Sequence, residues 1–140
     1  MRRAILTLFV AAVLSLPIVD ATAAVRTATK KVVSTRTFTG STVSVDRWGD
    51  LQVTIRVRKT TTTTGKKKAA VSRRIVGVSV PVYPNHTDRS VFINGQALPI
   101  LRSETLQRQS ARLDLVSGAT DTSDSYVQSL QAAIVKAKRA

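Results

Sequence analysis

Apolar and polar residues alternate most regularly between residues 51 and 58, which read LQVTIRVR. Because successive side chains of a strand point to opposite faces, this pattern predicts a strand with one buried and one solvated face. Residues 37–45 alternate as well and are rich in β-branched side chains, and residues 46–50 form a turn cluster between the two segments. The two segments are therefore expected to pair as an antiparallel hairpin.

A third strand is predicted at residues 75–83. Pro81 is expected near its end or on an edge, because proline has no N–H to donate to a neighbouring strand. The segment that precedes it, residues 59–74, reads KTTTTTGKKKAAVSRR and is of low complexity. We expect this basic segment to be a mobile hairpin loop on the surface, with an anion-binding finger as the alternative.

Helical spacing begins after residue 89. Between residues 90 and 106 it is interrupted by Asn94-Gly95 and by Pro99, so two short helical pieces are expected, with Pro99 in the first turn of the second. Residues 112–116 predict one last short strand. Residues 122–138 predict a strong helix, capped by Thr122 or Asp121 and ending in basic residues.

The order of these elements predicts an α+β fold, a small curved antiparallel sheet with helices packed on one face. The last helix follows the loop Ser117-Gly118-Ala119-Thr120. The folded domain is expected to cover residues 37–140, after a flexible leader at residues 24–36, where no periodicity is sustained.

The first 23 residues have the pattern of a signal peptide. Arg2 and Arg3 precede a nearly continuous apolar run, and Ala21-Thr22-Ala23 supplies the small residues of a cleavage site. The protein is therefore expected to be exported and extracytoplasmic, with the mature chain starting near Ala24. An uncleaved anchor helix is the alternative, which would leave the protein associated with the membrane or cell wall.

The amino-acid composition excludes several kinds of cross-link and metal site. The chain has no cysteine and one histidine, His86, which we expect to lie in a loop. Disulfides, cysteine-ligated zinc and iron–sulfur clusters are therefore excluded. Any redox chemistry must come from an organic cofactor.

The net charge of +14 indicates anionic partners. Aromatic residues make up 4% of the chain, which is few for a protein that stacks single-stranded bases. With the signal peptide, this argues against nucleic acid. We expect the charge to aid solubility and surface retention, and an anionic partner such as cell-surface polymer is the alternative.

The loop before the last helix has the character of a phosphate site. Gly118 permits close backbone approach, and the free N–H groups at a helix N-terminus favour a phosphate group. The Thr120 hydroxyl would lie beside that group. Glycine-containing loops before helices also turn and cap without binding anything, so the residues alone leave both interpretations open.

Residues 114–123, DLVSGATDTS, resemble the flavinylation motif of the FMN-binding domain family. The family includes the periplasmic flavin subunits of the sodium-translocating NADH:quinone oxidoreductase and of the Rnf complex. The resemblance covers roughly residues 37–137 and is strongest to small secreted members. Upstream it extends to residues 90–94, 97–101 and 109–111, which resemble the family's helical segment. It also includes Thr39-Gly40 and Trp48-Gly49, and at the position of Trp48 tyrosine is commoner in the family.

The resemblance implies an electron carrier rather than an enzyme, with FMN attached to Thr120 through a phosphoester. A flavin transferase of the ApbE type would supply the FMN from FAD, using magnesium, and membrane or extracellular redox partners would exchange electrons with it. The site residues implied are the phosphate-holding backbone of Gly118, Ala119 and Thr120, the loop-organising Asp114, the ring-flanking Leu98 and Val116, the polar Asn94, and the neighbouring hydroxyls of Ser117, Thr122 and Ser123.

Two other residues have a second interpretation. Arg89 is expected to be a surface arginine and alternatively a phosphate partner. Trp48 is expected to anchor a turn or the core and alternatively to stack on the flavin. The alternative function is an exported basic binding protein that uses the same fold without flavin and holds anionic cell-surface polymer.

Overall fold

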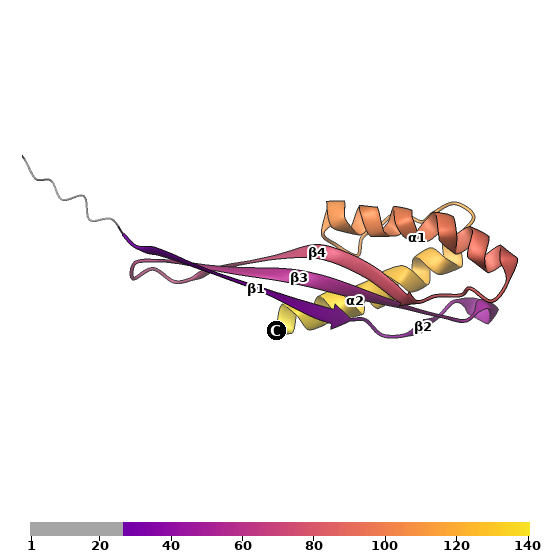
Figure 1. Ribbon diagram of the computed structural model, residues 1–140, viewed down its shortest axis with the longest axis horizontal. Coiled ribbons are helices and arrows are strands. Elements are labelled where there is room, and N and C mark those ends of the chain that lie inside the picture. The colour runs from indigo at the N-terminus through magenta and orange to yellow at the C-terminus, as the bar shows by residue number, and fades with distance from the viewer. Residues whose placement is uncertain (1–26) are drawn as a thin grey trace, which may run out of the picture.

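The computed structural model describes residues 27–140. Within them, four strands and a short 3-10 helix precede two long helices (Figure 1). The elements are β1 (Thr29–Thr39), β2 (Val43–Ser44), η1 (Asp46–Trp48), β3 (Asp50–Thr64), β4 (Ala70–Val82), α1 (Asp88–Arg108) and α2 (Thr120–Arg139). All pairings are antiparallel: β3 is central, β1 and β2 pair with it, and β4 pairs with it as well. The predicted α+β fold with a C-terminal helix is confirmed.

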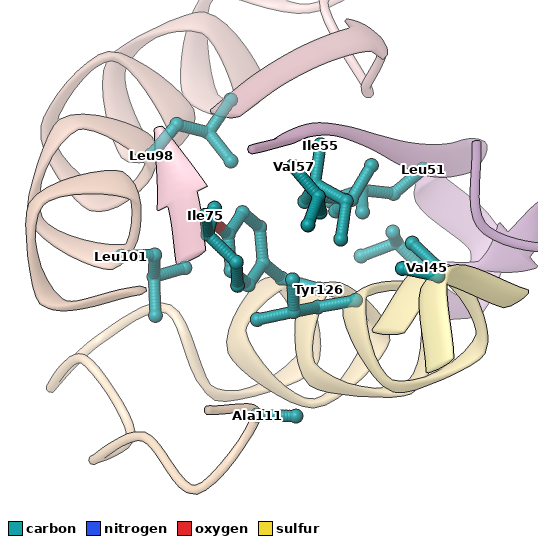
Figure 2. Packing of buried hydrophobic residues seen from close by; sticks show 13 residues of the cluster. Val45, Leu51, Ile55, Val57, Ile75, Leu98, Leu101, Ala111 and Tyr126 are labelled. Carbon is teal, nitrogen blue, oxygen red and sulfur yellow. The ribbon is translucent and has the colours of Figure 1, made fainter. Parts of the chain in front are cut away.

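The core lies between one face of the sheet and both helices. The alternate β3 residues Leu51, Val53, Ile55 and Val57 are buried, which confirms the predicted strand with one buried face. Figure 2 shows side chains from β3, β4, α1 and α2 gathered in this layer. The largest buried members are Leu51, Ile55, Leu101, Tyr126 and Leu130.

Two segments expected to be mobile are strands. Residues 29–36, which are part of the expected flexible leader, belong to β1. This strand pairs along its whole length with β3, from Thr29↔Thr64 to Thr39↔Thr54. Residues 59–74, taken as a loop, lie largely in β3 and β4, whose pairing reaches Thr62↔Ala70. The loop itself is only residues 65–69. Both expectations were wrong because these strand segments contain no buried residue and carry no hydrophobic alternation.

A single helix, α1, replaces the two pieces expected around Pro99. Proline in a helix interior removes the hydrogen bond to the carbonyl four residues earlier. That carbonyl belongs to Gly95, and both Gly95 and Pro99 are exposed. Water can therefore satisfy the Gly95 carbonyl, and the helix continues through the proline.

The short strand expected at residues 112–116 is absent from the described structure. Gln109 ends α1 in the left-handed conformation, and its side chain pairs with the backbone of β4. The Ile75 N–H donates to Gln109 Oε1 at 2.7 Å, and Gln109 Nε2 donates to the Ile75 carbonyl at 3.0 Å. The side-chain amide thus takes the position on the β4 edge that a further strand would need.

Helix α2 packs closely on the segment between β1 and β2. Ser129 accepts from the Val53 N–H at 2.8 Å and donates to the Ser41 carbonyl at 2.7 Å, while Ser125 donates to the Ser44 carbonyl. Gly40 lies directly against this helix: a Cβ placed there would lie 2.1 Å from the Ser129 carbonyl oxygen. Small residues on both sides therefore set the distance between α2 and the sheet.

Burial raises the pKa of Tyr126 to about 12, from an ordinary value of 10.0. The neutral phenol is therefore favoured in the folded state, and this stability, fully present below pH 10, is lost as the pH rises towards 12. Two pKa units correspond to roughly 3 kcal/mol. We expect the free energy of unfolding, measured with urea at pH 8, 10 and 11, to fall more steeply for the wild type than for Tyr126→Phe. Parallel curves would contradict this, since every other titratable group is common to both proteins.

At neutral pH the same Tyr126→Phe change is expected to cost about 1 kcal/mol, because the tyrosine and Thr105 hydroxyls share a buried hydrogen bond of 2.9 Å.

The expected signal peptide, residues 1–23, and residues 24–26 lie outside the described residues. Neither helix in the described part of the chain is both long and apolar enough to cross a membrane.

Candidate functional site

A pocket of about 120 Å³ lies where the N-terminal turns of the two helices meet the turn before β3. Three parts of the chain that are distant in sequence form its walls: the β2–η1 turn, the first two turns of α1 with the proline that precedes them, and the start of α2. The lining residues are Val45, Trp48, Pro84, Arg89, Ser90, Ile93, Asn94 and Gly118–Thr122.

The loop before α2 is a tight turn with a glycine that it requires. The Ala119 N–H donates to the Val116 carbonyl at 2.9 Å, and Gly118, third of the four residues, has φ +79°. A positive φ at that position is the mark of a type II turn, and glycine adopts it without strain. Ser123 fixes the turn by accepting from the Val116 N–H and donating to the Ala119 carbonyl.

The N-termini of the two helices differ in their capping. At α1, Thr87 accepts the Ser90 N–H through its side chain. At α2, the N-cap residue is Ala119, which has no side-chain acceptor. The helix begins at Thr120, two residues earlier than predicted, so the expectation that Thr122 or Asp121 caps it was wrong. The first N–H groups of α2, on the pocket wall, are thus free for an external acceptor.

The four hydroxyls of the sequence motif have different environments. Thr122 and Ser123 are buried and hydrogen-bonded, Thr122 to Asn94 and Ser123 within the turn. Ser117 is exposed but does not line the pocket. Thr120 is both exposed and on the pocket wall. Of the four, it alone combines access with this position.

Asn94 joins two of the three walls of the pocket, the α1 wall and the start of α2. Its amide donates to the Pro84 carbonyl at 2.7 Å and accepts from the Thr122 hydroxyl at 2.9 Å. Asn94 is 3% exposed. This side chain holds the loop before α1 to the start of α2, and its role as a polar contact to a flavin stays a prediction.

Trp48 and Arg89, whose alternative interpretations were a flavin contact and a phosphate partner, both line the pocket. Trp48 is partly buried, and the Arg47 guanidinium lies 5.3 Å from the centroid of its ring. Arg89 is exposed, in the first turn of α1, and makes no ion pair within residues 27–140. Asp121 also lines the wall. Its carboxylate opposes an anion there, so Arg89 and the helix N-termini must supply the attraction.

Besides Ser117 and Ser123, three expected site residues do not line this pocket. Asp114 is exposed, pairs with Arg108 and, through its backbone N–H, donates to Glu104, which ties the loop after α1 to that helix. Val116 lines the groove beside Asp114, and Leu98 is part of the buried core. None of the three lines the pocket that holds Thr120. Their expected flavin contacts stay untested predictions, and their observed contacts are structural.

The pocket is smaller than the roughly 300–1,000 Å³ that is typical of sites enclosing a small molecule. An exposed hydroxyl, an unpaired arginine and an uncapped helix end suit a phosphate group, whereas a complete flavin nucleotide exceeds the enclosed volume. A bound nucleotide would therefore place its phosphate in the pocket and most of its remainder outside. Residues 27–140 contain no cluster of histidine and acidic residues able to hold a metal ion.

No protein-family model matches this chain, and no curated protein matches it either.

Proposed function

We propose that this protein is an exported electron carrier in which FMN is attached to Thr120 through a phosphoester. The observation that carries the proposal is the position of the Thr120 hydroxyl, exposed on the wall of a phosphate-sized pocket at the uncapped N-terminus of α2. The resemblance of residues 114–123 to the flavinylation motif supports the same residue. The pocket geometry is a separate argument, because it also depends on segments outside that motif.

Each group of the site has a distinct part in holding the phosphate. The free N–H groups at the start of α2 donate to its oxygens, and the helix dipole favours its charge. Arg89 supplies a full positive charge from the first turn of α1. Asn94 and Ser123 fix the turn and the helix relative to each other. No side chain needs to act as an acid or base, because the flavin supplies the electron transfer when bound.

Attachment requires a flavin transferase that uses FAD and magnesium. The Thr120 Oγ displaces AMP from the FMN phosphorus, so that one P–O bond forms, the phosphoanhydride bond breaks, and the hydroxyl proton leaves. The covalent bond prevents loss of the cofactor from an exported protein.

Intact-mass measurement tests the proposal. After co-expression with a flavin transferase, the mass is expected to rise by one FMN minus one water, and the yellow colour is expected to remain with the denatured protein. A mass that does not change would refute covalent flavinylation.

Trp48 provides a test of the pocket that is independent of the sequence motif. It is the single tryptophan of the chain and lines the same pocket as Thr120. Flavin absorbs where tryptophan emits, so we expect the emission of Trp48 to be strongly reduced in the flavinylated protein relative to unmodified Thr120→Ala. Equal emission from the two proteins would place the flavin away from this pocket.

A further inference from the structure

The three long strands extend as a ribbon beyond the helices (Figure 1). We define the ribbon as residues 29–36 and 58–74, which pair in continuous register from Thr29↔Thr64 and Thr62↔Ala70 inward. At about 3.3 Å per residue, the strands of the ribbon are about 25 Å long. Its tip is the turn at residues 65–69, where the Gly65 N–H donates to the Ala28 carbonyl at 3.2 Å. The ribbon is thus a paired three-stranded structure up to its tip.

The ribbon is cationic throughout. It contains no aspartate or glutamate, and ten of its residues are basic: Lys30, Lys31, Arg36, Arg58, Lys59, Lys66, Lys67, Lys68, Arg73 and Arg74. The carboxylates of the described chain are all elsewhere, at Asp46, Asp50, Asp88, Glu104, Asp114, Asp121 and Asp124. Most of these lie in the elements that surround the pocket, at the other end of the long axis (Figure 1). The molecule is therefore strongly polarised along its length.

The register distributes the positive charges over both faces. Residues that pair directly share a face, so the face that continues the core side carries four cations and the opposite face three. On the core side are Lys30, Arg36, Lys59 and Arg73, and on the other are Lys31, Arg58 and Arg74. The three lysines of the tip complete the set. A flat charged surface could meet only one of these faces at a time.

We propose that the ribbon binds a flexible linear polymer of phosphodiester-linked polyols. Such a chain can follow the ribbon and contact both faces and the tip, which matches the distribution of charge. Arginine binds phosphate oxygens through its planar fork, and Lys66–Lys68 add point charges at the exposed tip. The threonines at residues 60–64 provide hydroxyls between the cations for the polyol. The proposal does not depend on flavin.

Nucleic acids and membrane surfaces fit the ribbon less well. It has no aromatic residue, the type that stacks on single-stranded bases and that settles at a membrane interface. Its three backbones are about 10 Å wide before side chains are added, while the major groove of DNA, about 12 Å wide, admits a two-stranded ribbon. A polyol phosphate chain requires neither aromatic side chains nor a ribbon narrow enough to enter a groove.

Binding of the purified protein to immobilised poly(glycerol phosphate) tests the proposal. The triple variant Lys66→Gln, Lys67→Gln, Lys68→Gln is expected to bind at least about tenfold more weakly. The matched control Arg47→Gln, Arg102→Gln, Arg112→Gln loses the same charge from exposed positions outside the ribbon and is expected to stay within about twofold of the wild type. Raising NaCl from about 0.05 to 0.2 M should weaken wild-type binding at least about tenfold.

Unchanged melting temperatures by circular dichroism show that both variants fold, as expected for exposed positions. Equal losses of affinity in the two variants would show that binding depends only on net charge, and this result would overturn the assignment of the binding site to the ribbon. Tighter binding to phosphatidylglycerol vesicles or to duplex DNA than to the polymer would overturn the choice of partner. Loss confined to the ribbon variant, with the polymer preferred, supports the proposal whether or not the protein carries flavin.

Discussion

Thr120→Ala is expected to abolish covalent flavin completely while leaving the fold intact. A phosphoester needs a hydroxyl oxygen, and alanine has none. Because Thr120 is exposed and makes no side-chain hydrogen bond within residues 27–140, we expect stability to change by no more than about 0.5 kcal/mol. Peptide mass spectrometry after co-expression with a flavin transferase measures the loss directly.

Neighbouring hydroxyls provide the controls for this experiment. Thr120→Ser keeps a hydroxyl at the same position and should keep the flavin. Ser117→Ala removes an exposed hydroxyl that is off the pocket and should not affect attachment. An adduct that persists in Thr120→Ala, or that maps to Ser117 in the wild type, would show that Thr120 is not the attachment point even if the protein is yellow.

Gly40→Ala is expected to destabilise the protein by about 3 kcal/mol, because overpacking of a rigid contact costs this much when the neighbours cannot move. The added Cβ would lie 2.1 Å from the Ser129 carbonyl oxygen and 2.6 Å from its hydroxyl. The carbonyl is part of the α2 backbone, so relief requires a shift of the helix away from the sheet. Urea unfolding monitored by circular dichroism measures the change.

Gly95→Ala is the matched control for that substitution. Nothing lies within 4 Å of a Cβ at Gly95, which is an exposed position inside α1. Alanine is the better helix former by about 1 kcal/mol, so the control is expected to be slightly more stable than the wild type. A Gly40→Ala protein as stable as the wild type would show that α2 does not rest on the sheet through this contact.

The parts of the fold with one buried face could be predicted from the sequence, and the exposed parts could not. The β3 residues 51–58 and helix α2 carry clear periods because one side of each packs on the core. The outer halves of β1, β3 and β4 are held by backbone pairing between residues up to 35 positions apart, such as Thr29 and Thr64. Such pairing leaves no trace in local hydrophobicity, so a threonine-rich basic segment is read as a loop.

The strand predicted at residues 112–116 is absent for a different reason. The segment has apolar residues, and both Ala111 and Leu113 pack on or against the core. Whether they form a strand depends on a free sheet edge, and the Gln109 side chain occupies that edge at Ile75. A side-chain amide that takes the place of a strand cannot be recognised from sequence alone.

The candidate site was predictable mainly within its contiguous motif, and Asn94 is the one expected residue outside the motif that lines the pocket. Gly118, Ala119 and Thr120 do line one pocket, since the turn and the helix start follow from local sequence. Trp48 and Arg89 reach the same pocket from segments about 72 and 31 residues away, and their convergence is a property of the fold. A tryptophan beside a turn glycine and an arginine in a first helical turn were the only signals.

The position of α2 after all the other described elements in sequence determines when this domain can form. Ser129 satisfies the Val53 N–H, Lys136 donates to the Thr39 carbonyl, and Tyr126 and Leu130 complete the core, so the sheet is incomplete without the last twenty residues. Domains that depend on such distant contacts fold slowly and late. The strands and α1 therefore have no complete core to pack around before α2 is present, and the domain can fold only once α2 is available.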